Sequence, residues 1–186
     1  GLRFPNVTLV GIIYADLSLH MPDFRAGERT FQLLTQVAGR AGRGEVEGDV
    51  FVQSFTPFHA AIQYARRHDY LGFYEQEMEF RKDTEYPPTS RMAMITLKGK
   101  NEEKLKMSGT HLKSVIEAIR EEIKDLARAG PSPAPLERAE NFFRYQIMLK
   151  TKRMSQLSHR LADIQQSTKL PEGVQTIIDI DPVSMH

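Results

Sequence analysis

The 186-residue chain contains no cysteine and no tryptophan, and its charges nearly balance at a formal net charge of +1. Without cysteine, neither disulfide bonds nor thiolate zinc sites can form. No apolar run approaches the roughly 20 residues that would span a bilayer, and the N-terminal residues do not form a secretory signal. We therefore expect a cytoplasmic chain with no membrane contact, in which any binding of polyanions depends on local clusters of basic residues.

Two further absences concern phosphate chemistry. The chain has no G-x-x-x-x-G-K-[ST] loop to hold a nucleotide and no Asp-Glu-x-His run to hold magnesium. Its six histidines have no paired spacing, so we expect no metal site. The chain by itself is therefore predicted to hydrolyse no nucleotide.

The residues that follow the first expected helix combine glycine and arginine in a fixed pattern. Positions 36–43 read QVAGRAGR, so Gly39 and Gly42 let the backbone approach a ligand while Arg40 and Arg43 lie three residues apart. A guanidinium stays charged and offers a planar fork of donors matched to phosphoryl oxygens. Chance would give these fixed positions in a chain of this length about once in ten thousand times. The pattern favours contact with a transferring phosphate over a solvated turn.

The first 57 residues have the pattern of an α/β lobe with a parallel sheet. Residues 7–13 form a nearly continuous apolar run, which is typical of a strand buried on both faces. Residues 26–37 have helical spacing, and the alternation around Val50 and Val52 predicts a short strand that Pro57 ends. Residues 58–85 are polar and helical, with aromatic side chains that we interpret as packing on the lobe rather than stacking on bases.

The remaining residues predict the order strand, helix, strand, strand, helix, strand. Alternating apolar residues place strands at 92–98, around 133–138, at 145–149 and at 174–180, and helical spacing places helices over 102–129 and 154–164. This order is that of a ferredoxin-like α+β sandwich, with an antiparallel sheet and helices on one face.

Basic residues gather where the third of these strands leads into the second helix. Arg144 and Lys150 share a strand face opposite Tyr145, while Lys152 and Arg153 open the following helix. They could form a solvated charged face, or they could bind the DNA backbone or an acidic peptide.

The glycine–arginine pattern and several other segments resemble one family, that of primosomal protein N-prime (PriA), the replication-restart DNA helicases of superfamily 2. The resemblance covers nearly the whole chain. It includes FPNVTLVG (4–11), AD (15–16), PDFRA (22–26), ER (28–29), QLLTQ (32–36), PP (87–88), GPSPAP (130–135), RYQIMLK (144–150) and IDIDP (178–182).

The resemblance implies three parts. Residues 1–57 would be the C-terminal part of a RecA-like helicase lobe 2, with Gly1 in motif V and residues 36–43 as motif VI. Residues 58–88 would be a helical connector, and residues 89–186 a ferredoxin-like, ribosomal-protein-like C-terminal domain. The nucleotide-binding lobe with the Walker loop, an N-terminal DNA-binding domain and the start of the second lobe would precede Gly1. The family's cysteine-rich zinc insertion is absent from this cysteine-free chain, so zinc is expected in the full-length protein and not here.

By the same resemblance, the full-length protein is an ATP-dependent 3′–5′ DNA helicase that uses ATP and Mg²⁺, restarts stalled forks and assembles the primosome. Arg43 would act on the γ-phosphate, Arg40 and Gly39 would make further nucleotide contacts, and Gln36 would couple the nucleotide site to DNA movement. Expected partners are forked and single-stranded DNA, single-stranded-DNA-binding protein and other primosome proteins, at a nucleoid-associated location. The alternative is a non-catalytic module that binds single-stranded DNA or the acidic tail of single-stranded-DNA-binding protein.

Overall fold

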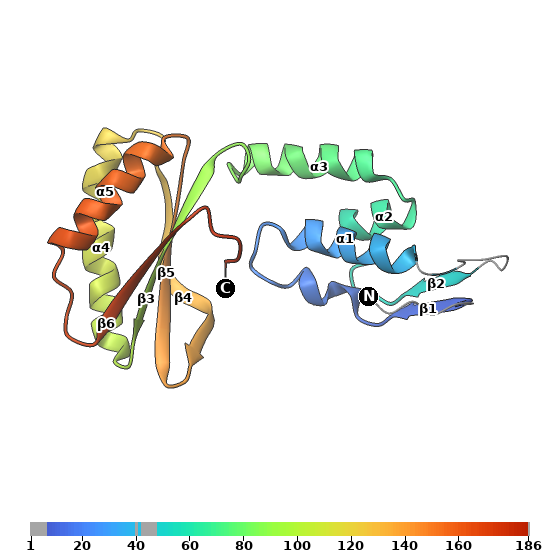
Figure 1. The fold of residues 1–186 in the computed structure, drawn as a ribbon, viewed down its shortest axis with the longest axis horizontal. Coiled ribbons are helices and arrows are strands. Elements are labelled where there is room, and N and C mark those ends of the chain that lie inside the picture. Colours follow the sequence, from blue (N-terminus) through green and yellow to red (C-terminus); the bar gives the residue numbers. More distant parts are fainter. Residues whose placement is uncertain (1–6, 40, 42–47, 186) are drawn as a thin grey trace. The chain divides into compact units, whose positions relative to one another are not determined.

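A computed structural model of the chain describes residues 7–39, 41 and 48–185, which divide into two compact units, residues 1–80 and 81–186 (Figure 1). The division falls inside helix α3. The elements, in chain order, are β1 (Leu9–Ile12), the 3-10 helix η1 (Ala15–Ser18), α1 (Ala26–Ala38), β2 (Asp49–Val52), α2 (Ala60–Arg66), α3 (Tyr70–Asp83), β3 (Arg91–Gly99), α4 (Glu102–Glu122), β4 (Ala127–Ala139), β5 (Phe142–Thr151), α5 (Met154–Ser167) and β6 (Val174–Ile180).

The first unit contains a parallel pair of strands joined through α1. β1 and β2 pair from Leu9↔Asp49 to Ile12↔Val52, as the sequence predicts for an α/β unit. The prediction that the first strand is buried on both faces is wrong for the described residues, because its residues alternate between exposed and half-buried and Leu9 is 61% exposed. Helices cover one face of this two-stranded sheet, so alternate side chains meet solvent (Figure 1).

The core of the first unit is built mainly from helices. Phe31 in α1 and Phe73 in α3 stack with parallel rings 4.3 Å apart, and Ala61 in α2 is fully buried in the same core. The interpretation of the aromatic residues as core therefore holds for Phe73. Tyr70 and Tyr74, in contrast, are largely exposed.

The second unit has the strand and helix order that the sequence predicts. Its sheet has the order β4-β5-β3-β6, every neighbouring pair is antiparallel, and α4 and α5 cover one face (Figure 1). This is the split βαβ arrangement of a ferredoxin-like domain. The buried residues between the sheet and the helices include Ile95, Leu97, Leu105, Leu112, Ile116, Ile147, Leu149, Leu157 and Leu161.

One boundary in this unit differs from the expectation. The helix expected to reach residue 129 ends at Glu122, and Ala127 already pairs with Lys150 as the start of β4. Ile123 and Leu126 are both buried, so the turn after the helix keeps apolar residues at helical spacing and hides the boundary in the sequence. Further along β4, Gly130 has φ +89°, and a Cβ there would lie 2.5 Å from the carbonyl oxygen of Gln146, so the position requires glycine.

The face of this sheet opposite α4 and α5 is called the open face below. It carries Met94, Thr96 and Lys98 from β3, Phe142, Arg144, Gln146 and Lys150 from β5, and Ile177 and Asp179 from β6. The chain after β6 turns back on this side, where Gln146 Nε2 donates to the carbonyl oxygen of Met185 at 3.4 Å (Figure 1). In the described ranges, none of the helices combines the length and the apolar character that crossing a membrane would require.

Candidate functional site

Helix α1 is fixed at its start by a buried carboxylate. Asp23 Oδ1 accepts the backbone N–H of Arg25 at 3.0 Å, and the guanidinium of Arg29 lies 3.0 Å from Asp23 Oδ2. Glu28 adds a negative charge in the first turn, where it interacts favourably with the helix dipole. These contacts hold the N-terminal end of α1 against the preceding segment.

The predicted phosphate-binding residues begin at that C-terminal end. Gln36 is exposed, and Gly39 donates its N–H to the carbonyl oxygen of Thr35 at 3.0 Å as the helix ends. Gly39 has φ −67°, and a Cβ there would make only ordinary contacts, so the described fold does not itself require glycine at this position. Arg40 and Arg43 lie outside the described residues.

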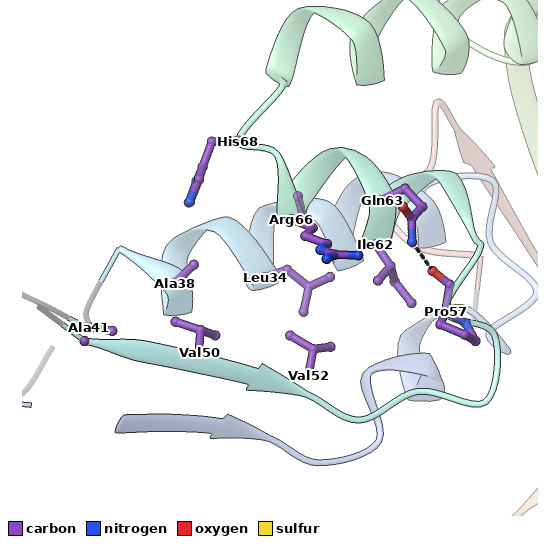
Figure 2. A pocket seen from close by; sticks show the side chains of 12 residues that line it. Leu34, Ala38, Ala41, Val50, Val52, Pro57, Ile62, Gln63, Arg66 and His68 are labelled. Atoms are coloured by element: carbon purple, nitrogen blue, oxygen red, sulfur yellow. Dashed lines mark hydrogen bonds between the residues drawn. The ribbon is translucent and has the colours of Figure 1, made fainter. Parts of the chain in front are cut away.

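A hollow of about 510 Å³ lies beside the end of α1, between α1, β2 and α2 (Figure 2). Leu34, Ala38, Val50 and Ile62 make it largely apolar, while Arg66 and His68 lie among the polar residues that line it. The amide of Gln63 is held by a 2.7 Å hydrogen bond to the carbonyl oxygen of Pro57. Among the described residues this lining is largely apolar and contains no carboxylate, which suits packing against another apolar segment rather than binding magnesium.

A second buried carboxylate, which sequence reasoning missed, holds the loop after β2. Asp16 is fully buried and accepts hydrogen bonds from the hydroxyls of Ser54 and Thr56 and from the backbone N–H groups of Phe55 and Thr56. Burial raises the pKa of Asp16, but these hydrogen bonds, led by that of Thr56, outweigh burial and hold the pKa well below its usual range. The carboxylate therefore joins η1 to the loop that leads into α2.

In the second unit, the predicted basic residues fall into two groups. Arg144 and Lys150 lie on the open face, as the alternation predicts. Each is directly opposite a β3 residue of the same face, Arg144 opposite Lys98 and Lys150 opposite Met92. The ammonium group of Lys150 is already engaged, since it donates to the carbonyl oxygen of Thr84 and lies 4.5 Å from the centre of the Tyr86 ring.

Lys152 and Arg153 are exposed at the start of α5, beside an acidic residue. Asp125 Oδ2 accepts the backbone N–H of Lys152 at 2.8 Å, and Asp125 Oδ1 lies 3.7 Å from Arg153 Nε. Burial raises the pKa of Asp125, but the hydrogen bonds from the N–H of Lys152 and the hydroxyl of Thr151 lower it by more. The net shift of the pKa is therefore downward. The positive charge at this junction is thus partly compensated within the chain.

Sequence reasoning also missed an aromatic residue on the open face. Phe142 lies beside Lys98 and Lys100, whose Nζ atoms are 4.5 and 5.4 Å from its ring centre. The alternation of β3 and β5, read together, could have placed these residues on one face with Arg144, but only once the two strands are known to pair. Within the described ranges, no group of three or more His, Asp or Glu side chains is placed to hold a metal ion.

Comparison with known proteins gives matches over the whole chain. The family model described as "Primosomal protein N C-terminal domain" matches residues 82–183. The protein named "Replication restart protein PriA" from Bacillus subtilis (strain 168) is 42% identical over 188 aligned residues, which cover all of this chain and 23% of that protein. The proteins of the same name from Rickettsia felis and Synechocystis are 37% and 36% identical, with all of this chain and 28% and 22% of those proteins covered.

This chain therefore spans about a quarter of the length of these relatives. The family model matches more than half of the chain, and it matches the unit whose strand order predicted a ferredoxin-like domain. The chain belongs to the PriA family of replication restart proteins.

Proposed function

We propose that this chain is the C-terminal part of an ATP-dependent 3′–5′ DNA helicase that restarts stalled replication forks and assembles the primosome. The observation that carries the proposal is the β1–α1–β2 unit, in which a parallel pair is joined by a helix that ends at Ala38, within the glycine–arginine sequence of residues 36–43. Parallel strands joined by a helix are the building unit of nucleotide-binding α/β lobes, in agreement with a partial RecA-like lobe 2. Relatives named as replication restart proteins support the biological role.

The proposed roles rest on the spacing of residues 36–43 and on the family resemblance. Arg43 stabilises charge on the γ-phosphate, Arg40 makes a second phosphate contact, and the exposed Gln36 couples the nucleotide site to DNA movement. The backbone conformation of Gly39 is one that any residue can adopt, so the fold does not explain why glycine stands here. Close approach of a ligand to the backbone does explain it. ATP and Mg²⁺ would be held by the remainder of the full-length protein, together with the zinc site that this cysteine-free chain cannot form.

The test is the turnover of the full-length protein. Arg43→Ala should lower DNA-stimulated ATP hydrolysis about 10³- to 10⁵-fold, because an arginine that contacts the transferring phosphate has an effect of this size. Arg67→Ala provides the matched control, since Arg67 is exposed at the end of α2 and lies outside the glycine–arginine sequence of residues 36–43. Near wild-type turnover in Arg43→Ala, with normal DNA binding, would rule out the phosphate role.

The second candidate function is a binding module in the C-terminal unit. Lys152 and Arg153 are exposed at the start of α5, where cations and backbone N–H groups can face an anion. We propose that they contact single-stranded DNA or the acidic tail of single-stranded-DNA-binding protein. Lys150 lies at the same end of β5, whereas Arg144 pairs with Lys98 towards the other end and could contribute only to a longer ligand.

This second function has its own test. Titration of an acidic tail peptide against full-length protein carrying Lys152→Glu and Arg153→Glu should show weaker binding than wild type, and the wild-type affinity should fall with added salt because exposed ion pairs are screened over about 8 Å at physiological ionic strength. Unchanged affinity in the double variant would leave these charges as a solvated surface.

A further inference from the structure

Three basic residues and one aromatic residue gather at one end of the open face. Lys98 on β3 and Arg144 on β5 are direct cross-strand partners. Phe142 precedes Arg144 by two residues on the same strand face, and the Nζ atoms of Lys98 and Lys100 lie 4.5 and 5.4 Å from the centre of its ring. We call these four residues the Phe142 cluster.

The cations of the Phe142 cluster are not paired with carboxylates. Within the described residues, Lys98, Lys100 and Arg144 form no ion pair with Asp or Glu. Five other arginines of this unit and Lys106 do form one, in the pairs Arg91–Asp181, Lys106–Glu102, Arg120–Glu117, Arg128–Glu117, Arg153–Asp125 and Arg160–Glu122, whereas other lysines, such as Lys104, Lys113 and Lys124, also form none in the described ranges. The positive charge of the cluster is therefore not compensated by an ion pair within the described chain.

The arrangement is also unfavourable to the sheet itself. Like charges placed directly opposite each other on neighbouring antiparallel strands destabilise the pair. Lys98 and Arg144 occupy such positions in the β3–β5 ladder, where a neutral pair would be better for stability. Residues that lower the stability of the fold, with no contact in the chain that offsets the loss, are expected at sites that bind a ligand. Because the residues here are basic, that ligand must be an anion.

The surroundings of the cluster favour a chain-like anion over a single ion. A hollow of about 250 Å³ on the open face is lined by Lys98, Arg144 and Gln146, and the C-terminal residues Pro182 and Met185 form another part of its wall. Asp179 is the carboxylate of this lining. Cations thus continue from the Phe142 ring to the hollow, so a ligand with repeated negative charges could contact both.

We propose that the Phe142 cluster binds single-stranded nucleic acid, with the ring stacking on an unpaired base and the three cations contacting the flanking phosphates. Aromatic rings that stack bases beside basic side chains are the usual device for single-stranded binding, and four-stranded sheets with helices on one face present such rings on the other face. Single-stranded nucleic acid supplies a ring beside every negative charge, whereas an acidic peptide has no ring in its charged residues. This site adds a second contact with the DNA of the proposed function, and its biological role rests on that function.

The experiment measures binding of a fluorescently labelled 15-nucleotide oligo-dT to the 186-residue chain without ATP, over a series of salt concentrations. Phe142→Leu keeps an apolar side chain and removes the ring, and it should weaken binding at least about 5-fold, the lower end of the effect of removing one base-stacking ring. Phe142→Tyr should retain wild-type affinity. Lys98→Gln and Arg144→Gln should each lower the salt dependence, by about 0.7 in the slope of log K against log salt for every phosphate that the variant no longer neutralises.

Lys113→Gln is the matched control, because it removes the same charge from an exposed position on α4, on the other side of the sheet. It should leave both affinity and salt slope near wild type. Circular dichroism of each variant verifies that it is folded, and Phe142→Tyr keeps the test decisive if Phe142→Leu does not fold, since loss of binding in a folded tyrosine variant contradicts stacking.

Three results would overturn the proposal: no oligo-dT binding at low salt, equal affinity in folded Phe142→Leu and wild type, or binding of an acidic peptide at the cluster with none of oligo-dT. Each is independent of the ATPase measurement. Failure of Arg43→Ala to slow turnover would leave the oligonucleotide result standing, and failure of oligonucleotide binding would leave the ATPase result standing.

Discussion

At the scale of single residues, Asp16 stabilises the first unit only while its carboxyl group is ionised. Burial raises its pKa, and four hydrogen bonds from Ser54, Phe55 and Thr56 lower it by more, so the net shift is downward from the usual 3.8. A group with a lowered folded-state pKa contributes stability that is fully present above its unfolded-state pKa and is lost as pH falls towards the folded value. The contribution of Asp16 is therefore present above about pH 4.

We expect Asp16→Asn to lower the urea midpoint of the first unit at pH 7, because an amide oxygen cannot accept all the hydrogen bonds that the carboxylate accepts. The difference from wild type should shrink as pH falls below about 4, where the carboxylate of the unfolded chain is protonated. Asp49→Asn is the control, since Asp49 is exposed on β2 and its substitution should have little effect. Equal midpoints for Asp16→Asn and wild type at pH 7 would contradict this account.

A site can be proposed from the sequence where its residues have a local signature. The spacing of Arg40 and Arg43 behind Gln36 predicts phosphate contacts without any knowledge of the fold, and these contacts stay a prediction. Asp16 and the Phe142 cluster have no such signature, because their partners lie 38 or more residues away for Asp16 and on a separate strand for Phe142. Only strand pairing and loop closure bring these groups together.

At the scale of elements, the existence of α5 and its buried face could be predicted, because its large apolar residues recur at helical spacing, although the helix continues to Ser167 beyond the predicted end at residue 164. Leu157 and Leu161 are buried under the sheet together with Met154 and Ile164. The end of α4 could not be predicted, because Ile123 and Leu126 continue the helical spacing through a turn. Periodicity therefore identifies an element and leaves its boundary to capping and pairing contacts.

The packing of α5 gives a quantitative expectation. Leu161→Ala should destabilise the second unit by about 2–5 kcal/mol, since it deletes a side chain that is 1% exposed in a core that can collapse only partly. Met107→Ala on α4, where the side chain is 70% exposed, should change stability by less than about 0.5 kcal/mol. Urea unfolding of both variants measures the difference, and a destabilisation below about 1 kcal/mol for Leu161→Ala would show that α5 packs less tightly than described.

At the scale of the whole molecule, the division between the two units falls inside α3 rather than in a separate linker. Residues from Arg81 onward make their contacts with the second unit. The hydroxyl of Thr89 donates to the carbonyl oxygen of Arg81 at 3.0 Å, and Lys150 binds the carbonyl oxygen of Thr84 and lies over the ring of Tyr86. The sequence predicts boundaries at residues 57 and 88 because prolines occur there and the composition changes. Neither feature depends on these long-range contacts, so the boundary inside α3 could not be predicted from them.

These contacts predict how pieces of the chain will fold. Residues 88–186 should fold alone, because the four strands and two helices form a closed core. Residues 81–186 should be more stable by about 1–2 kcal/mol, since they restore the hydrogen bond and the cation–π contact of Lys150. Residues 1–57 should not unfold cooperatively, because they lack Ala61, Ile62 and Phe73 from the core of the first unit.

Urea unfolding of the three pieces followed by circular dichroism provides the measurement. A version of residues 81–186 with Lys150→Met is the internal control, because it removes the ammonium group and keeps a similar apolar length. Its stability should fall towards that of residues 88–186. Equal midpoints for residues 81–186 and 88–186 would show that the segment before Pro88 adds nothing to the second unit. A cooperative transition in residues 1–57 would show that β1, α1 and β2 can form a core without α2 and α3.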